Sequence, residues 1–333
     1  MARFLFAAHD PGGAHLLSAV APLIRARGHE IVFAAAGPTA RLWTEAGFAP
    51  QSVAAAAEID ADGIDAVATG TGFGDFERGV WLWARERGWP TLAAIDAWTS
   101  LARRFQTDAG PVQPDAVAVL DTPATRELEA LNWWRARLIT VGQPHLEAQT
   151  AALAARRAEL PGHDGPPRIV FFSEPVREDY GTTRGFDQFE VFAGLMVRLP
   201  SAWRIDLTVK PHPREDWARW QKILPRGVEL AEAATPELLI GADGAVGMTT
   251  MVLIEAHLLG LPVLSLQPAR TGNANPLVDD IGTPVLRWQE FAAAWRDFHA
   301  AVGRPQPVAE RFGGLLDRAA ERLADAIEAT RNA

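Results

Sequence analysis

The residues best suited to chemistry lie in two short segments of the second half of the chain. Lys210 and His212, within a Lys-Pro-His-Pro segment, follow a predicted strand and offer an ammonium group and an imidazole. Further along, Thr249 and Thr250 precede a predicted helix that carries Glu255 about one turn from its start. Cations and the N–H groups of a helix start bind phosphate oxygens, and a carboxylate accepts sugar hydroxyls. The combination predicts a nucleotide site in an enzyme that handles an activated sugar, although a Thr pair is also a common helix cap.

Two further segments of the second half are predicted to contact the same nucleotide. Ser173 and Glu174 follow the first strand of this half, and Arg270 lies in a polar loop with Asn273 and Asn275 after a later strand. A hydroxyl and a guanidinium at strand ends can meet a base or a phosphate. A solvated loop of mixed polarity is the alternative interpretation for both.

The first half places a His-Asp pair directly after its first predicted strand. His9 and Asp10 are candidates for a general base, and Gly12 and Gly13 let a ligand approach the backbone closely. The spacing is not the G-x-G-x-x-G of a dinucleotide site. A tight turn with a helix cap is the alternative.

A second group of candidates follows a later strand of the first half. Asp96 can accept hydroxyls, Trp98 can stack on a sugar ring, and Arg103 can bind an anion. These three residues, with Gly12 and Gly13, are predicted to bind the acceptor. A capping Asp beside a buried Trp would explain the segment equally well.

Apolar strand-like runs alternate with helix-period segments along nearly the whole chain, which predicts parallel sheets with crossover helices. Strands are expected at 3–8, 30–35, 66–69, 91–95, 116–120, 138–141, 168–173, 204–209, 228–230, 244–246, 262–266 and 285–286. Helices are expected at 14–27, 39–46, 75–87, 123–131, 145–159, 186–199, 217–223, 235–241, 251–259, 288–302 and 307–329.

A Pro- and Gly-rich cluster at 161–167 reads as a linker. It divides the chain into an acceptor-binding domain at 1–160, a nucleotide-binding domain at 161–306 and a final helix at 307–333. The expected fold is α/β, with two Rossmann-like doubly wound domains that face each other across a cleft, where the carboxyl ends of both sheets bind ligands.

The composition excludes several classes of protein. The 333 residues have a net charge of −9 and no cysteine, so nucleic-acid binding, disulfides and thiolate chemistry are not expected. The apolar run at the N-terminus is too short for a signal peptide, and no stretch approaches the ~20 apolar residues of a membrane span. Asp60 and Asp62 form a D-x-D that precedes a strand, and it is interpreted as a surface turn instead of a metal site. A cytoplasmic enzyme without metal or cofactor is expected.

The whole pattern resembles the GT-B superfamily of glycosyltransferases. The Lys210–Pro213 segment is similar to that of bacterial capsule and teichoic-acid transferases, and the 248–262 segment with Glu255 also resembles UDP-GlcNAc 2-epimerases. The resemblance implies that the second domain binds the nucleotide, that the first supplies the base and binds the acceptor, and that the final helix returns to the first domain. It further implies an inverting, metal-independent transferase that uses a CMP-, CDP- or UDP-linked sugar in surface polysaccharide or glycan synthesis.

Two other functions fit the same sequence. One is a sugar-nucleotide epimerase or hydrolase, although Thr249 and Thr250 stand where that epimerase family has paired glycines. The other is a non-catalytic nucleotide-binding module. The sequence leaves open the donor nucleotide, the sugar, the acceptor, which of His9 and Asp10 is the base, and the oligomeric state.

Overall fold

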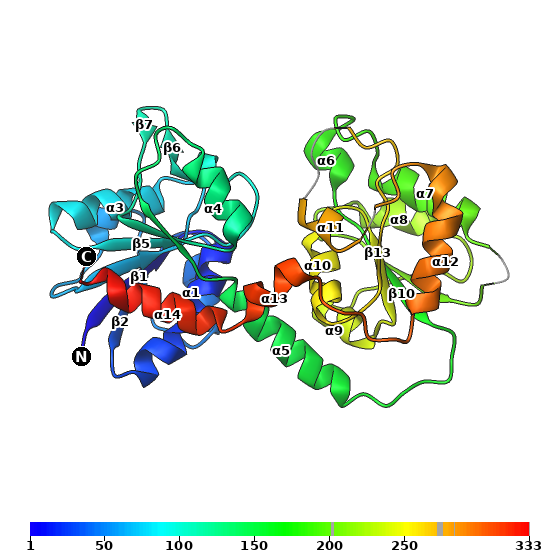
Figure 1. The fold of residues 1–333 in the computed structure, drawn as a ribbon, viewed down its shortest axis with the longest axis horizontal. Coiled ribbons are helices and arrows are strands. Elements are labelled where there is room, and N and C mark those ends of the chain that lie inside the picture. Colours follow the sequence, from blue (N-terminus) through cyan, green and yellow to red (C-terminus); the bar gives the residue numbers. More distant parts are fainter. Residues whose placement is uncertain (201–202, 272–275, 283, 333) are drawn as a thin grey trace. The chain divides into compact units, whose positions relative to one another are not determined.

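The computed structural model describes residues 1–200, 203–271, 276–282 and 284–332, so Asn273 and Asn275 lie outside the described residues. Contacts between residues divide the chain into two compact units. Unit 1 consists of Met1–Ala148 and Gly313–Ala333, and unit 2 consists of Gln149–Phe312. Each unit is a parallel sheet with helices on both faces (Figure 1).

The sheet of unit 1 has seven strands in the order β3-β2-β1-β4-β5-β8-β9. Their bounds are β1 (Arg3–Ala8), β2 (Glu30–Ala35), β3 (Gln51–Ser52), β4 (Ala66–Thr69), β5 (Thr91–Ala94), β8 (Ala116–Val119) and β9 (Arg137–Thr140). All the pairings within it are parallel. β1 pairs with β2 on one side and with β4 on the other, so the strand order reverses between β1 and β4. Ligands of open α/β sheets bind at such a switch point, beyond the carboxyl ends of the strands.

The helices of unit 1 are α1 (Pro11–Ala26), α2 (Thr39–Glu45), η1 (Ala56–Glu58), α3 (Phe76–Glu86), η2 (Ala102–Phe105), α4 (Thr122–Glu129), α5 (Pro144–Ala158, which continues into unit 2) and α14 (Ala319–Thr330). A short antiparallel hairpin, β6 (Gln106–Thr107) with β7 (Gly110–Pro111), adds to them.

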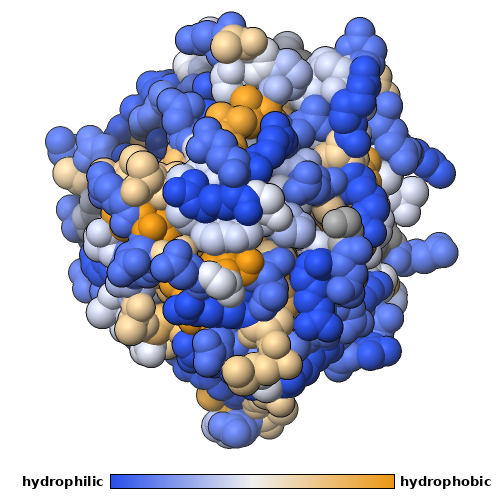
Figure 2. Space-filling model, turned by 90° about the vertical axis from the view of Figure 1, so that its left-hand side faces the viewer, coloured by the Kyte–Doolittle hydropathy of each residue, from blue (hydrophilic) through white to orange (hydrophobic). Residues whose placement is uncertain are grey.

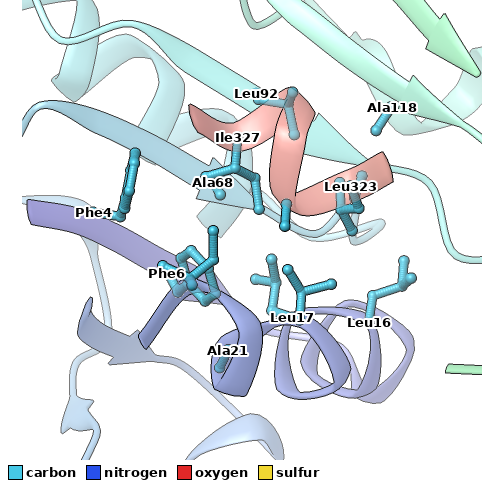
Figure 3. Packing of buried hydrophobic residues seen from close by; sticks show 14 of the residues in the cluster. Phe4, Phe6, Leu16, Leu17, Ala21, Ala68, Leu92, Ala118, Leu323 and Ile327 are labelled. Carbon is cyan, nitrogen blue, oxygen red and sulfur yellow. The ribbon is translucent and has the colours of Figure 1, made fainter. Parts of the chain in front are cut away.

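The core of unit 1 has two layers because successive side chains of β1 point to opposite faces of the sheet. Phe4 and Phe6 pack with α1 and with Leu323 and Ile327 of α14 (Figure 3). Leu5 and its neighbours pack on the other face, against α3. Apolar residues from both ends of the chain therefore build one core.

Unit 2 has a five-stranded parallel sheet in the order β12-β11-β10-β13-β14. Its strands are β10 (Arg168–Phe172), β11 (Asp206–Lys210), β12 (Glu229–Leu230), β13 (Gly244–Gly247) and β14 (Val263–Ser265). Its helices are α6 (Val176–Tyr180), α7 (Gln188–Arg198), α8 (Trp217–Ile223), α9 (Thr235–Gly241), α10 (Met251–Leu258), α11 (Pro276–Asp280), η3 (Trp288–Glu290), α12 (Phe291–Ala301) and α13 (Glu310–Leu316), the last of which crosses into unit 1. The order reverses between β10 and β13, so the loops after these two strands are adjacent.

The chain between 307 and 329 differs from the expected single helix. It forms α13 and α14 with a break at Arg318, whose backbone is left-handed with φ of 51°. The units divide at 148/149 and 312/313, where the sequence places boundaries at 160/161 and 306/307. The expected strand at 285–286 is a single bridge between Leu266 and Val285.

The surface drawn in Figure 2 is mainly hydrophilic, with apolar residues in small groups between the polar ones. Among the described residues, none of the helices combines the length and the apolar character that crossing a bilayer requires.

Candidate functional site

The switch point of unit 1 is built on two glycines in backbone contact. A Cβ added to Gly13, in the first turn of α1, would lie 2.8 Å from the Cα of Gly70, which follows β4. Only residues without side chains allow this approach. It brings the start of α1 and the loop after β4 together at the carboxyl edge of the sheet.

His9 and Asp10 form a hydrogen-bonded pair at this edge. Nδ1 of His9 lies 2.6 Å from Oδ1 of Asp10, and the second carboxylate oxygen accepts the N–H of Phe73 at 3.2 Å. The Asp10 carboxylate is thus engaged through both oxygens, and it fixes the His9 tautomer with the proton on Nδ1. Nε2 then has the lone pair, in a side chain that is 37% exposed. A Cβ at Gly37 would lie 2.5 Å from Nε2, so this glycine makes room for the ring.

A buried glutamate that the sequence did not single out supports the pair. Glu77 is 1% exposed, and its Oε1 accepts the N–H of His9 at 2.8 Å. Its Oε2 has no hydrogen-bond partner among the described residues. Burial raises the pKa of Glu77, the bond from His9 opposes the rise, and the charge of Asp10 adds to it. A Cβ at Gly72 would lie 2.7 Å from Glu77 Oε2 and 2.9 Å from Asp10 Oδ2, so both carboxylates border this glycine.

Asp96 lies at the start of α1, where it is held by the protein itself. Its Oδ2 occupies the space that a Cβ at Gly12 would need, and its Oδ1 pairs with Arg104 at 2.5 Å. Arg104 is 4% exposed and also bonds to the carbonyl and the hydroxyl of Thr71. Gly12 therefore meets a carboxylate of this chain at the helix start, whereas Gly13 meets the backbone of Gly70.

Trp98 and Arg103, the other predicted acceptor residues, differ in exposure. Trp98 is 7% exposed, and its indole N–H donates to Asp121 at 2.8 Å. The ring is thus unavailable for sugar stacking in this conformation. Arg103 is exposed, and its guanidinium carbon lies 5.5 Å from the centre of the Phe73 ring.

In unit 2, the half-buried carboxylate of Glu174 lies at the predicted phosphate site. Oε1 of Glu174 accepts the N–H and the hydroxyl of Thr249, and Thr250 caps α10 by accepting the N–H of Val252. Burial raises the pKa of Glu174, while the bonds from Thr249 oppose the shift. Helix α10 begins where the sequence predicts, but the N–H and the hydroxyl of Thr249 already donate to Glu174.

His212 and Ser173 meet at one buried glutamate. Oε1 of Glu215 accepts the Ser173 hydroxyl at 2.8 Å, and Oε2 accepts the N–H of His212 at 2.6 Å. His212 Nδ1 accepts the N–H of Arg214 at 3.2 Å, which leaves the ring proton on Nε2. Burial, followed by the charge of Arg214, lowers the pKa of His212, so the neutral ring is favoured.

The remaining predicted nucleotide residues have partners within unit 2. Lys210 Nζ lies 3.4 Å from the carbonyls of Ala231 and Glu232, and Arg270 pairs with Asp279 at 2.8 Å. Glu255 accepts from Gln149 at 3.1 Å. Burial raises the pKa of Glu255 to about 7, and the bond from Gln149 opposes that rise.

The sequence identified the candidate residues better than it identified the glutamates that accept hydrogen bonds from them. Glu174 lies next to Ser173 in a segment that the sequence singles out, but its bonds from Thr249 are visible only in the fold. Glu77 and Glu215 lie on or before helices, where a glutamate is ordinary, and their burial is visible only in the fold. Among the described residues, no group of three or more His, Cys, Asp or Glu side chains is arranged to hold a metal ion.

Neither a protein-family model nor a curated protein sequence matches the chain. Solved structures do. The UDP-GlcNAc 2-epimerase of Neisseria meningitidis, bound to UDP-GlcNAc, has a TM-score of 0.71 at 12% identity, over 98% of this chain and 100% of that one. The UDP-GlcNAc 2-epimerase of Methanocaldococcus jannaschii has 0.70 at 11%, over 98% and 99%. The calicheamicin glycosyltransferase CalG4 has 0.59 at 15%, over 100% and 98%.

Identities this low establish the fold and nothing finer. The resemblance that the motifs predict, to GT-B glycosyltransferases and UDP-GlcNAc 2-epimerases, is confirmed at the level of structure. The chain has the GT-B fold, with two Rossmann-like units of parallel sheets flanked by helices.

Proposed function

We propose that the chain is a sugar-nucleotide enzyme whose reaction is glycosyl transfer to a glycan or small-molecule acceptor. One observation carries the proposal. The dipeptide Ser173-Glu174 holds the His212 loop on one side, through Glu215, and the start of α10 on the other, through Thr249. Segments that are far apart in sequence, and whose groups suit a phosphate, thus converge at the switch point of unit 2.

The roles follow from the donors and acceptors. A nucleotide phosphate would accept hydrogen bonds from the start of α10 and from the Nε2–H of His212, which Arg214 leaves available to donate. Glu255 would accept a ribose or sugar hydroxyl. These groups would stabilise the negative charge that gathers on the departing nucleotide.

In unit 1 the geometry favours His9 over Asp10 as the base. Both oxygens of Asp10 are engaged, and the oxygen bonded to Nδ1 orients the imidazole with Nε2 as the acceptor. In the proposed step, Nε2 takes the proton of an acceptor hydroxyl and that oxygen attacks the anomeric carbon. The bond from the anomeric carbon to the phosphate oxygen breaks, and its electron pair leaves with the nucleotide.

Epimerisation or hydrolysis of a sugar nucleotide is the second candidate. It is favoured by the structural comparison, in which the epimerases have TM-scores of 0.70 and 0.71 against 0.59 for the glycosyltransferase. In that reaction the same site would bind the sugar nucleotide, and water or the substrate itself would take the place of the acceptor.

Thermal unfolding in the presence of UDP, CDP, CMP or GDP tests nucleotide binding first, because a ligand of the folded state raises the melting temperature. Incubation with UDP-GlcNAc and CMP-sugars then separates the reactions. Product formed without an acceptor supports epimerisation or hydrolysis, and product formed only with an acceptor supports transfer. A protein that binds a nucleotide tightly but turns over nothing would be a binding module, and one that binds none of the four would contradict the proposal.

A further inference from the structure

Phe73 is an exposed aromatic side chain at the switch point of unit 1. It lies in the loop between β4 and α3 and is 47% exposed. The guanidinium carbons of Arg103 and Arg104 lie 5.5 Å and 5.1 Å from the ring centre. An aromatic ring that is half exposed adds less to the stability of the folded chain than a buried one. The position of Phe73 therefore suits a role in binding a ligand.

The Phe73 loop is held from both sides. Its N–H donates to Asp10 Oδ2 at 3.2 Å, and its carbonyl accepts from Arg78 at 3.1 Å. Arg78 is itself buried and donates to the carbonyl of Arg104 at 3.1 Å. The backbone of Phe73 is therefore held in place, and it contacts the carboxylate that orients His9.

The two arginines beside the ring are not equivalent. Arg104 is buried and committed to Asp96 and Thr71. Arg103 is exposed and makes no ion pair with any residue that the structure describes. An exposed ring and an available guanidinium thus lie side by side, next to the proposed base.

We propose that Phe73 and Arg103 form a subsite for the ring of an anionic sugar. The apolar face of the sugar ring packs against the exposed part of Phe73, and its carboxylate or phosphate pairs with Arg103. The sequence suggests Trp98 for stacking on the sugar, but Trp98 is buried with its N–H bonded to Asp121. Phe73 takes that role in the proposal. This inference rests on the proposed function, and it specifies the substrate that reaches His9 as negatively charged.

Saturation-transfer NMR with glucose, glucuronate and glucose 6-phosphate, without any nucleotide, tests the subsite. We expect the two charged sugars to bind the wild-type chain and glucose to bind more weakly, and the stronger of the two identifies the preferred anion. Arg103→Gln should weaken the charged sugars roughly tenfold and leave glucose unchanged. Phe73→Ala should weaken all three sugars by roughly three- to tenfold, and Phe73→Trp should restore binding.

Arg126→Gln on α4 and Leu82→Ala on α3 are matched controls, because both residues are exposed in unit 1 and lie outside the subsite. The melting temperature of each variant shows whether it folds, and the Phe73→Trp variant keeps the test valid if Phe73→Ala does not. Equal binding of glucose and the charged sugars, or no binding of any probe, would overturn the proposal. A nucleotide-binding failure would show in the thermal-unfolding experiment instead, so the two failures are distinguishable.

Discussion

Thr249 donates both its backbone N–H and its hydroxyl to one oxygen of Glu174, at 2.5 Å and 2.8 Å. At the start of α1, Asp96 Oδ2 occupies the space that a Cβ at Gly12 would need. At both switch points, a carboxylate of the chain lies where the positive end of a helix favours an anion. A bound phosphate in unit 2 must therefore share or displace Glu174.

Glu174→Gln should tighten UDP binding, because it removes a negative charge beside the phosphate and keeps the shape of the side chain. For the wild-type chain, UDP affinity should rise as pH falls through the raised pKa of Glu174, since protonation removes the same charge. Calorimetric titration at several pH values measures both effects. The glutamine variant serves as the control for titration of UDP itself, and a parallel pH dependence in the two proteins would rule out this role for Glu174.

His212→Ala should weaken UDP binding by roughly three- to tenfold, the effect of losing one hydrogen-bond donor. Fluorescence or calorimetric titration gives the dissociation constant. His163→Ala is a matched control, because this histidine pairs with Asp243 at 2.8 Å before β10, at the opposite end of the sheet from the predicted site. If His212→Ala bound UDP as tightly as the wild type, the proposed nucleotide site would be wrong.

His9→Gln should lower turnover by about 10²–10⁴-fold, the usual contribution of a general base, with little change in UDP affinity. Asp10→Asn should lower turnover as well, because it no longer holds the Nδ1–H tautomer of His9. Steady-state rates on the substrate found in the incubation experiment provide the measurement. A variant of Asp10 that lost far more activity than the variant of His9 would reverse the assignment of the base.

Glu255 should make stability depend on pH. Its folded-state pKa of about 7 lies above the ordinary 4.5. Between these values the folded chain holds a proton that the unfolded chain has released, so stability falls as pH rises, by about 3 kcal/mol in all. Glu255→Gln should remove the contribution of Glu255 to this decline, which melting temperatures between about pH 5 and pH 8 would show.

Glu127→Gln, at an exposed position of α4, is the control for that series and should follow the wild type. Glu77, Glu174 and Glu215 also have pKa values raised by burial, so part of the decline should persist in the Glu255 variant. Identical melting curves for wild type and Glu255→Gln at every pH would contradict the expected titration.

Gly13→Ala should destabilise unit 1 by about 1–3 kcal/mol, because the new Cβ would force α1 away from Gly70. Gly79→Ala on α3 is the matched control, since its Cβ would meet only Ala56 Cβ at 4.0 Å. Alanine is the better helix former there, by up to about 1 kcal/mol. Urea unfolding followed by circular dichroism compares the two, and equal midpoints would show that the glycine contact is dispensable.

The sequence predicted the sheets well because strands buried on both faces form unbroken apolar runs between polar breakers. The runs at 3–8 and 30–35 coincide with β1 and β2. β3 has two residues and leaves no such run. The break at Arg318 was hidden because helical periodicity continues across it, and a left-handed arginine has no sequence signature.

The sequence predicted where the candidate residues lie better than it predicted their hydrogen-bond partners. Residues after strands of a parallel sheet share one edge, so His9, Asp96, Ser173 and Thr249 could be placed from strand order alone. Their partners could not, because Glu77 and Glu215 are joined to them by the fold and not by spacing. The same limit applies to Trp98, whose aromatic character suggested stacking although the chain buries it.

Unit 1 is built from both ends of the chain, and this affects the order in which a nascent chain folds. Leu323 and Ile327 complete the layer that Phe4 and Phe6 begin, whereas unit 2 is one uninterrupted stretch between them. During translation, unit 2 can fold before α14 has been synthesised. The residues of β1, which are synthesised first, remain incompletely packed until α14 follows. A translation product cut short before α14 would thus combine a finished second half with an open, protease-sensitive first half.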